Sequence, residues 1–242
     1  MNAVKILKLT KKYKDLTAVN ALDLEIGEGE LFALLGVNGA GKTTTVKMLS
    51  CLTAPSEGDA EICGKSIVRE SGAVKKMIGV SPQETAIAPG LSVKENLELM
   101  CGIYGFSREK REAKICELTR MFALDEVLFK KAGKLSGGWQ RKLSIAMALI
   151  GEPSVLFLDE PTLGLDVIAR SNLHDMILAL KGKITVILTT HYMEEADALA
   201  DRIGIMAGGK LIAVGTSAEL KEMTGTDTLE KAFVSIVKGA TV

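Results

Sequence analysis

The sequence predicts an α/β fold with three parts: a wound parallel sheet as the core, an N-terminal antiparallel β subdomain, and an inserted helical subdomain. Three observations support this prediction. A glycine-rich loop at residues 36–44 joins an apolar run to a stretch with helical spacing, the apolar pattern has a helical period between about residues 90 and 150, and short apolar runs after residue 150 alternate with helical patterns. The 242 residues, 47% of them hydrophobic, suffice for one such domain with an insertion.

Residues 2–30 are predicted to form antiparallel strands. Apolar and polar positions alternate along them, and Gly27 and Gly29 are turn signals. A further strand is expected at residues 60–67, where it joins the N-terminal strands in the β subdomain.

The loop at residues 36–44 has the spacing G-x-x-x-x-G-K-[ST], which predicts a phosphate-binding loop and hence a P-loop NTPase core. Glycines let consecutive backbone N–H groups turn toward phosphates, and the next helix points its positive dipole end at them. Lys42 is expected to reach the β- and γ-phosphates of a nucleoside triphosphate, and Thr43 to ligate Mg²⁺. A plain glycine-rich turn before a helix is the alternative. The other predicted nucleotide-binding residues of this loop are Gly36, Asn38, Gly39, Ala40, Gly41 and Thr44.

Helices are predicted between about residues 90 and 150. Ser92 followed by Glu95 forms a capping box, which marks a helix start. Ser107 precedes a second helical stretch, whose apolar residues recur at three- and four-residue steps: Ile115, Leu118 and Phe122.

Three later apolar runs are typical of buried parallel strands: residues 155–158, 184–188 and 203–206. Between the first two runs lies a helical stretch with apolar residues on one face, namely Leu173, Met176, Ile177 and Leu180. This alternation of strands and helices predicts the wound sheet of the core.

Two carboxylates follow the first of these strands. Ligands of wound α/β sheets bind at the carboxyl ends of the strands, where the phosphate loop also lies. We therefore expect Asp159 to hold Mg²⁺ directly or through water, and Glu160 to orient the attacking water and accept its proton. A solvated acidic strand end is the alternative. His191 ends the same kind of strand and is expected to hydrogen-bond the γ-phosphate or the attacking water, whereas His174 is predicted to be a surface residue.

Residues 135–140 offer a second phosphate site at a helix start. Ser136 supplies a hydroxyl, and Gly137 and Gly138 supply backbone amides, ahead of a helix predicted at residues 142–150. The chain has one phosphate loop, and it lies far away in the sequence, which raises the hypothesis that this second site completes the pocket of another chain. A flexible helix N-cap is the alternative.

Gln83 lies on a probable loop at the entry to the helical insertion. Its amide can bind water and a metal ion, and its position suggests a hinge that couples rotation of the insertion to the nucleotide. A polar loop residue without such a role is the alternative.

Composition argues against several classes of function. Thirty basic and thirty acidic residues balance, with no long block of either sign, so nothing favours nucleic-acid binding. Four cysteines without a C-x-x-C spacing and two histidines argue against a zinc site and a disulfide framework, and favour a reducing, cytosolic compartment. No apolar run approaches the roughly 18 residues of a membrane span, so we expect the chain neither to cross a membrane nor to be secreted.

The order of these motifs resembles that of the nucleotide-binding subunit of an ABC transporter, and the resemblance covers essentially the whole chain. Tyr13 falls where that family places an aromatic residue that stacks on adenine. The matching motifs are Walker A at residues 36–43, the Q-loop at Gln83, the signature motif at residues 135–140, Walker B with its catalytic glutamate at residues 155–160, the D-loop at Leu165 and Asp166, and the switch histidine His191.

The resemblance implies an ATPase that binds ATP and Mg²⁺, with Gln83 near the water and the metal. Two such domains would clamp two ATP molecules head to tail, with Ser136 and Gly138 of one domain touching the γ-phosphate held by Lys42 of the other. Hydrolysis would then release the clamp. Two residues depart from the family pattern: Leu163, which bears on how Asp166 meets the partner subunit, and Trp139, which gives the signature helix a bulky start.

Residues 191–203 and 228–233 are similar to the daunorubicin-resistance type of ATP-binding subunit, which serves two-component exporters. The implied partners are an integral-membrane permease and a second ATP-binding subunit, identical or paralogous, and the implied location is the cytoplasmic face of the cell membrane. Residues 91–106 are the candidate permease contact, and their alternative role is the core of the helical subdomain.

We thus expect one ATP-binding domain over residues 1–242. Its predicted parts are the β subdomain and ATPase core at about residues 1–89 and 151–215, the helical signature subdomain at about 90–150, and a C-terminal helical extension at about 216–242. The main rival is a soluble ABC-type ATPase of repair, translation or assembly, which would usually carry coiled coils, zinc modules or a second ATPase domain. A kinase with a phosphate loop would leave residues 135–140 unexplained.

Overall fold

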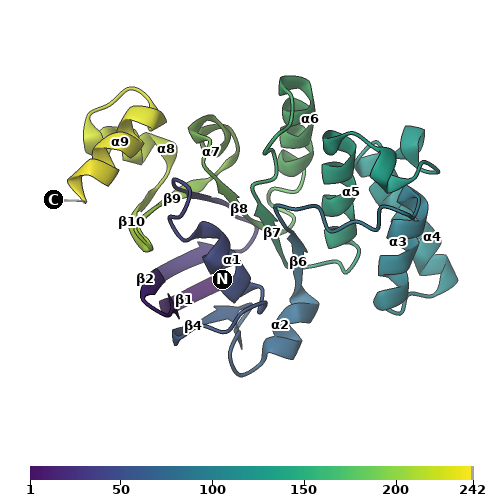
Figure 1. Ribbon diagram of the computed structural model, residues 1–242, viewed down its shortest axis with the longest axis horizontal. Helices are drawn as coiled ribbons and strands as arrows, with labels where there is room; N and C mark the ends of the chain where they lie inside the picture. The colour runs from purple at the N-terminus through teal and green to yellow at the C-terminus, as the bar shows by residue number, and fades with distance from the viewer. Residues whose placement is uncertain (241–242) are drawn as a thin grey trace.

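Two β-sheets form the centre of the protein in a computed structural model that describes residues 1–240 (Figure 1). The smaller sheet is antiparallel, as predicted for the N-terminal residues, and has the strand order β2-β1-β4-β5. Its strands are β1 (Asn2–Tyr13), β2 (Leu16–Gly27), β4 (Glu57–Ile62) and β5 (Lys65–Ser66). The single strand predicted at residues 60–67 is wrong, because Cys63 and Gly64 adopt positive φ angles of 49° and 76° and turn the chain into a hairpin.

The larger sheet has six strands in the order β10-β9-β3-β8-β7-β6, and all neighbours are parallel except β9 and β10. Its strands are β3 (Leu31–Leu35), β6 (Ile78–Ser81), β7 (Val155–Asp159), β8 (Thr185–Thr190), β9 (Arg202–Ala207) and β10 (Lys210–Gly215). The parallel strands predicted after residue 150 are confirmed as β7, β8 and β9. The sequence analysis missed the two edge strands, β6 because four residues are too short for a periodic signal, and β10 because most of it is only half-buried.

The helices are arranged around the larger sheet, with α3, α4 and α5 at one end of the molecule and α8 and α9 at the other (Figure 1). The capping box of Ser92 and Glu95 is confirmed at the start of α3, and Ser107 caps α4. The bounds are α1 (Lys42–Leu49), α2 (Ser71–Met77), α3 (Val93–Ile103), α4 (Arg108–Met121), α5 (Gly137–Leu149), α6 (Val167–Leu178), α7 (Met193–Leu199), α8 (Ser217–Thr224) and α9 (Leu229–Gly239), with short 3₁₀ helices η1 (Asp125–Val127) and η2 (Ala132–Lys134).

The central strands are buried on both faces, which explains their continuous apolar sequence. Alternate residues of β3 enter two different apolar clusters. Phe32 and Leu34 pack with α1 and the smaller sheet, whereas Leu31, Ala33 and Leu35 belong to the cluster that the helices on the other face complete. One face of the larger sheet therefore packs against the β subdomain, and the other face packs against the helices, including those of the insertion.

No helix within residues 1–240 is both long and apolar enough to span a bilayer. The predicted helical extension at about 216–242 contains α8 and α9, and its last two residues, 241 and 242, lie outside the described part. The division of the chain into subdomains at the stated residues stays a prediction.

Candidate functional site

The phosphate loop connects the end of β3 to the start of α1 and depends on two glycines that lie against other backbone segments. A Cβ atom at Gly36 would lie 2.5 Å from the carbonyl oxygen of Met206, and one at Gly41 would lie 2.5 Å from that of Ala18. Gly41 also has a φ of 104°, a left-handed value that only glycine adopts without strain, and it is the N-cap of α1. The loop is therefore held in one shape, with the N-terminus of α1 directed toward the pocket.

Lys42 is the first residue of α1, and its side chain is 5% exposed. The Nζ atom donates to the carbonyl oxygens of Gly36 at 2.7 Å and Val37 at 3.2 Å, and it lies 3.7 Å from Oε1 of Glu160. Burial lowers the pKa of Lys42 from its ordinary value, and the nearby carboxylates of Glu160 and Asp159 act in the opposite direction. The ammonium group thus lies inside the loop, next to the position expected for phosphates.

Asp159 and Glu160 lie at the carboxyl end of β7, on the same side of the sheet as the phosphate loop. Oδ1 of Asp159 accepts a hydrogen bond of 3.2 Å from the Thr43 hydroxyl. Glu160 has a φ of 47°, which is uncommon for a residue with a side chain, and strain of this kind clusters at functional sites. The predicted convergence of the two carboxylates on the phosphate loop is present in the structure.

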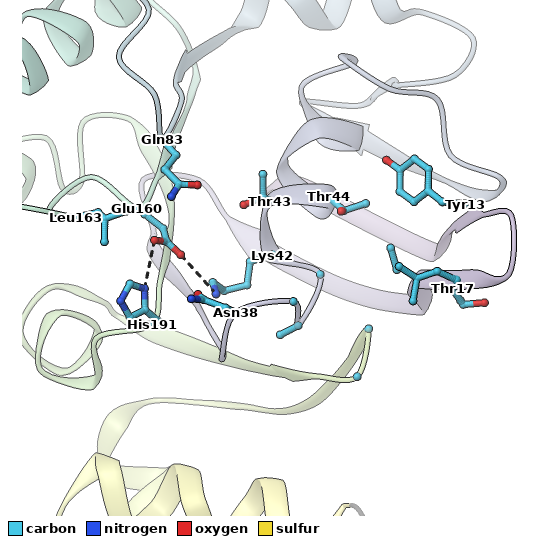
Figure 2. Close-up of a pocket in the computed structure, with 17 residues that line it drawn as sticks. Tyr13, Thr17, Asn38, Lys42, Thr43, Thr44, Gln83, Glu160, Leu163 and His191 are labelled. Atoms are coloured by element: carbon cyan, nitrogen blue, oxygen red, sulfur yellow. Dashed lines mark ion pairs between the residues drawn. The ribbon is translucent and has the colours of Figure 1, made fainter.

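The Glu160 carboxylate lies between two nitrogen groups from distant parts of the sequence (Figure 2). Its Oε1 faces Lys42, and its Oε2 lies 3.3 Å from Nδ1 of His191, which follows β8. The geometry of the second contact is not that of a hydrogen bond, and the buried Nδ1 has no hydrogen-bond partner among residues 1–240. His191 also lines the cavity around Lys42, which gives its ring access to a bound ligand.

These residues line a cavity of about 670 Å³. Tyr13 lies at the opposite end of the cavity from His191, is 45% exposed, and is accompanied there by Leu16 and Thr17 (Figure 2). The predicted site residues that line this cavity are Tyr13, Asn38, Gly39, Ala40, Gly41, Lys42, Thr43, Thr44, Gln83, Glu160 and His191, and Leu163 lies among them.

Mg²⁺ prefers one or two protein oxygen ligands together with phosphates and water. The Thr43 hydroxyl and the Asp159 carboxylate are such ligands, already within hydrogen-bond distance of each other, and Gln83 lines the same cavity as Thr43. In the described residues no group of three or more His, Cys, Asp or Glu side chains could hold a metal alone. The donor set therefore fits a magnesium ion that arrives with a nucleotide.

The predicted second phosphate site lies elsewhere. Ser136, Gly138 and Asp166 line a separate cavity of about 370 Å³ with Trp139, whose ring lies 4.7 Å from Nζ of Lys142. The Asp166 carboxylate accepts a hydrogen bond from the Ala169 N–H and caps α6. None of these residues lines the cavity around Lys42.

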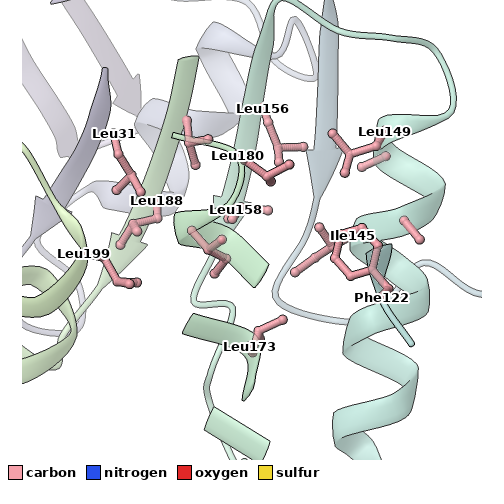
Figure 3. Close-up of a cluster of buried hydrophobic side chains, with 14 of the residues drawn as sticks. Leu31, Phe122, Ile145, Leu149, Leu156, Leu158, Leu173, Leu180, Leu188 and Leu199 are labelled. Carbon is pink, nitrogen blue, oxygen red and sulfur yellow. The ribbon is translucent and has the colours of Figure 1, made fainter. Parts of the chain in front are cut away.

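Helix α5 begins at Gly137, which corrects the predicted start at residue 142. Ser136 is its N-cap by backbone position, but its hydroxyl makes no capping hydrogen bond, unlike those of Ser92 and Ser107 on their helices. Apolar residues of α5 such as Ile145 and Leu149 anchor the helix in the core (Figure 3). Ser136 thus lies at the start of a well-packed helix, and its hydroxyl makes no hydrogen bond to that helix.

His174 is not a surface residue, contrary to the prediction. Its side chain is 18% exposed, and its Nε2 lies 3.3 Å from Oε1 of Glu195, a side chain that is 1% exposed. The apolar face of α6 packs toward α7, which covers the imidazole; periodicity alone gave no sign of this contact.

The sequence analysis also missed Arg141, which joins α5 to the Q-loop. Its guanidinium donates to the carbonyl oxygens of Pro82 and Gln83, both at 2.6 Å, and burial lowers its pKa. A second buried contact joins the same segments, between the hydroxyls of Ser81 and Ser144 at 2.9 Å. In the sequence, the only sign of this role was an arginine among the apolar residues of α5.

We expect Arg141→Lys to lower the free energy of unfolding by about 1–2 kcal/mol, because lysine keeps the buried charge but lacks the planar fork that serves both carbonyls. Urea unfolding measures the change. The matched control is Arg108→Lys, at an exposed residue of α4, where the expected change is below about 0.5 kcal/mol. Equal stability of the two variants would contradict the role given to Arg141.

The comparisons with known proteins identify the family of this chain. The family model described as ABC transporter matches residues 19–163, and a model described as AAA domain, putative AbiEii toxin, Type IV TA system, matches residues 131–197. The chain is 43% identical over 221 residues to the daunorubicin resistance ATP-binding protein DrrA3 of Streptomyces coeruleorubidus, covering 91% of this chain and 70% of the relative. It is 37% identical over 237 residues to the probable multidrug ABC transporter ATP-binding protein YbhF of Escherichia coli, covering 95% and 41%.

Solved structures give the same result. The structure of an ATP-binding subunit of an ABC transporter is 27% identical, with a TM-score of 0.87, and the match covers 97% of this chain and 99% of that one. A dimeric ATP-binding cassette in a post-hydrolysis state with ADP and phosphate is 28% identical, with a TM-score of 0.79 over 88% and 98% of the two chains. This chain belongs to the ABC transporter family and is an ATP-binding domain that hydrolyses ATP.

Proposed function

We propose that this chain hydrolyses ATP in the cavity between the phosphate loop and Glu160, and thereby powers a separate membrane permease that exports its substrate. One observation carries the proposal: the Glu160 carboxylate, next to the phosphate loop, is flanked by Lys42 Nζ at 3.7 Å and His191 Nδ1 at 3.3 Å. A carboxylate in this setting has a cation for the phosphates on one side and an imidazole on the other.

Each residue has a stated task in this proposal. Lys42 exchanges its carbonyl partners for the β- and γ-phosphates, and Glu160, released from Lys42, accepts the proton of the attacking water. His191 hydrogen-bonds the γ-phosphate or that water. Thr43, Asp159 and Gln83 would hold Mg²⁺, which would neutralise negative charge on the phosphates. Tyr13, at the far end of the cavity, stacks on the adenine.

We further propose that two chains associate head to tail, so that Ser136, Gly137 and Gly138 of one act on the ATP of the other. Two features support this arrangement. The Ser136 group lines a different cavity from Lys42, and the Ser136 hydroxyl is not used to cap its own helix. Asp166 lies in the same cavity as Ser136 and would therefore face the partner chain.

Ser136→Arg is expected to leave ATP binding by the monomer within about twofold of wild type and to abolish dimer formation and turnover, because a long cation replaces the small hydroxyl at the partner's phosphate site. Equilibrium binding of a fluorescent ATP analogue and light scattering measure the two effects. The matched control, Ser235→Arg, changes an exposed residue of α9 and should change neither. Weaker ATP binding by the Ser136→Arg monomer would instead place both phosphate sites in one pocket.

We propose that a permease segment docks on the helical insertion beside α3. Ile103 and Tyr104 are 69% and 37% exposed, and Leu52 is 68% exposed. Tyr104, Leu52 and Met100 line a common groove of about 410 Å³ near β6, whose last residue precedes the Q-loop. The two roles considered for residues 91–106 thus belong to different residues, since Leu97 and Cys101 are buried in the core while Met100 and Tyr104 line the groove.

The relatives named for daunorubicin resistance and multidrug transport support a role in export. We propose that the chain acts at the cytoplasmic face of the cell membrane, with an identical or paralogous second ATP-binding subunit. Affinity purification of the chain from detergent-solubilised membranes of its native cell, followed by mass spectrometry, tests the proposal. We expect a multi-span protein in near-equal amount. Recovery from the soluble fraction alone, or with soluble partners, would favour the rival class of soluble ABC-type ATPases.

A further inference from the structure

Thr189, near the end of β8, contacts both carboxylate residues of the site. In the parallel pairing of β7 and β8 it lies opposite Asp159, and its side chain is fully buried. Its hydroxyl donates to Oδ1 of Asp159 at 2.5 Å and accepts a hydrogen bond of 3.1 Å from the backbone N–H of Glu160. One hydroxyl therefore joins the two residues that the proposed function assigns to the metal and to the attacking water.

The two carboxylate oxygens of Asp159 have different surroundings. Oδ1 accepts from the hydroxyls of Thr189 and Thr43, at 2.5 and 3.2 Å. No hydrogen bond to Oδ2 occurs in the part of the chain that the structure describes. The pair of hydroxyls fixes the rotation of the carboxylate and leaves one oxygen for a cation or its water.

The same hydroxyl supports the backbone of Glu160. This residue has a φ of 47°. Its N–H donates to both the hydroxyl and the carbonyl oxygen of Thr189, each at 3.1 Å. Because the carbonyl alone would still satisfy the N–H, the hydroxyl is not required to avoid an unpaired buried donor. Valine would fill the same volume in a fully buried strand, so packing does not require the hydroxyl either.

We infer that Thr189 is a positioning residue, which sets the orientation of Asp159 toward Mg²⁺ and holds the backbone of Glu160. The inference rests on the proposed function, since it concerns the metal expected at Thr43 and Asp159. Sequence patterns gave no sign of it, because Thr189 falls within an apolar strand and is separated from Asp159 by a complete helix.

The test is binding of Mn²⁺, a paramagnetic substitute for Mg²⁺, to the protein with a non-hydrolysable ATP analogue, followed by electron paramagnetic resonance. Thr189→Val should weaken Mn²⁺ binding roughly tenfold, the lower end of the usual effect for partners of metal ligands. Affinity for the analogue in EDTA should stay within about twofold, because no phosphate contact is lost. Thr185→Val, at the other end of β8, removes an equally buried hydroxyl and should change neither.

A second pair of variants separates the hydroxyl from packing. Thr189→Ser and Thr189→Ala both lose the methyl group, and only serine keeps the hydroxyl, so serine should bind Mn²⁺ close to wild type and alanine should not. Wild-type Mn²⁺ affinity in Thr189→Val and Thr189→Ala would overturn the inference while the proposed metal site stands. If the wild-type protein with the analogue binds no Mn²⁺, the metal site itself is wrong, and the inference falls with it.

Discussion

Glu160→Gln is expected to retain ATP and to lose nearly all hydrolysis. The amide keeps the size of the side chain but cannot accept a proton from the attacking water, and a general base contributes roughly 10²–10⁴-fold to the rate. The amide also ends the ion pair with Lys42, so the nucleotide no longer competes with a carboxylate for that cation. We therefore expect ATP affinity at least equal to wild type, and a dimer that persists because ATP is not consumed.

Phosphate release gives the rate, and size-exclusion chromatography with ATP gives the dimer. Glu57→Gln is the matched control, since this exposed glutamate of β4 pairs with Lys12 on the surface, away from the cavity. Its rate should equal that of wild type. Hydrolysis by Glu160→Gln at the wild-type rate would show that another group accepts the proton, and His191, 3.3 Å from the carboxylate, would be examined next.

Lys42→Ala is expected to weaken ATP binding roughly ten- to a hundredfold, which corresponds to the loss of a charge-assisted hydrogen bond of about 1.5–3 kcal/mol. The substitution removes the ammonium group that donates to the carbonyl oxygens of the phosphate loop, and it leaves Glu160 without its cationic neighbour. The remaining negative charge of Glu160 then repels the phosphates, which adds to the loss.

Calorimetric titration with ATP measures this change, and Lys47→Ala provides the control because Lys47 is an exposed residue on the same helix, α1. The control should bind ATP as the wild type does. Tight binding by Lys42→Ala would mean that the backbone N–H groups and the metal supply the affinity, and that Lys42 acts on the reaction alone.

Local patterns in the sequence predicted most of the residues that line the cavity proposed for ATP. They missed five others that also line it: Leu16, Thr17, Ala18, Gly208 and Gly209. The phosphate loop is recognisable because its glycines and its lysine are close in the chain and the loop shape depends on them. Asp159, Glu160 and His191 were found because strand ends in a wound sheet meet at one edge. His174 was assigned to the surface wrongly, because its partner Glu195 lies on another helix.

The sequence by itself determined the α/β class, the central parallel strands, the caps of α3 and α4 and the motifs proposed for the ATP site, since each depends on residues near one another in the chain. Only the tertiary structure decided which distant segments touch. It joined Thr189 to Asp159, joined Arg141 to the Q-loop, and put Ser136 and Lys42 in separate cavities. These contacts depend on strand order and helix packing, which bring together segments that are distant in the chain. The local sequence of each segment does not indicate its partner.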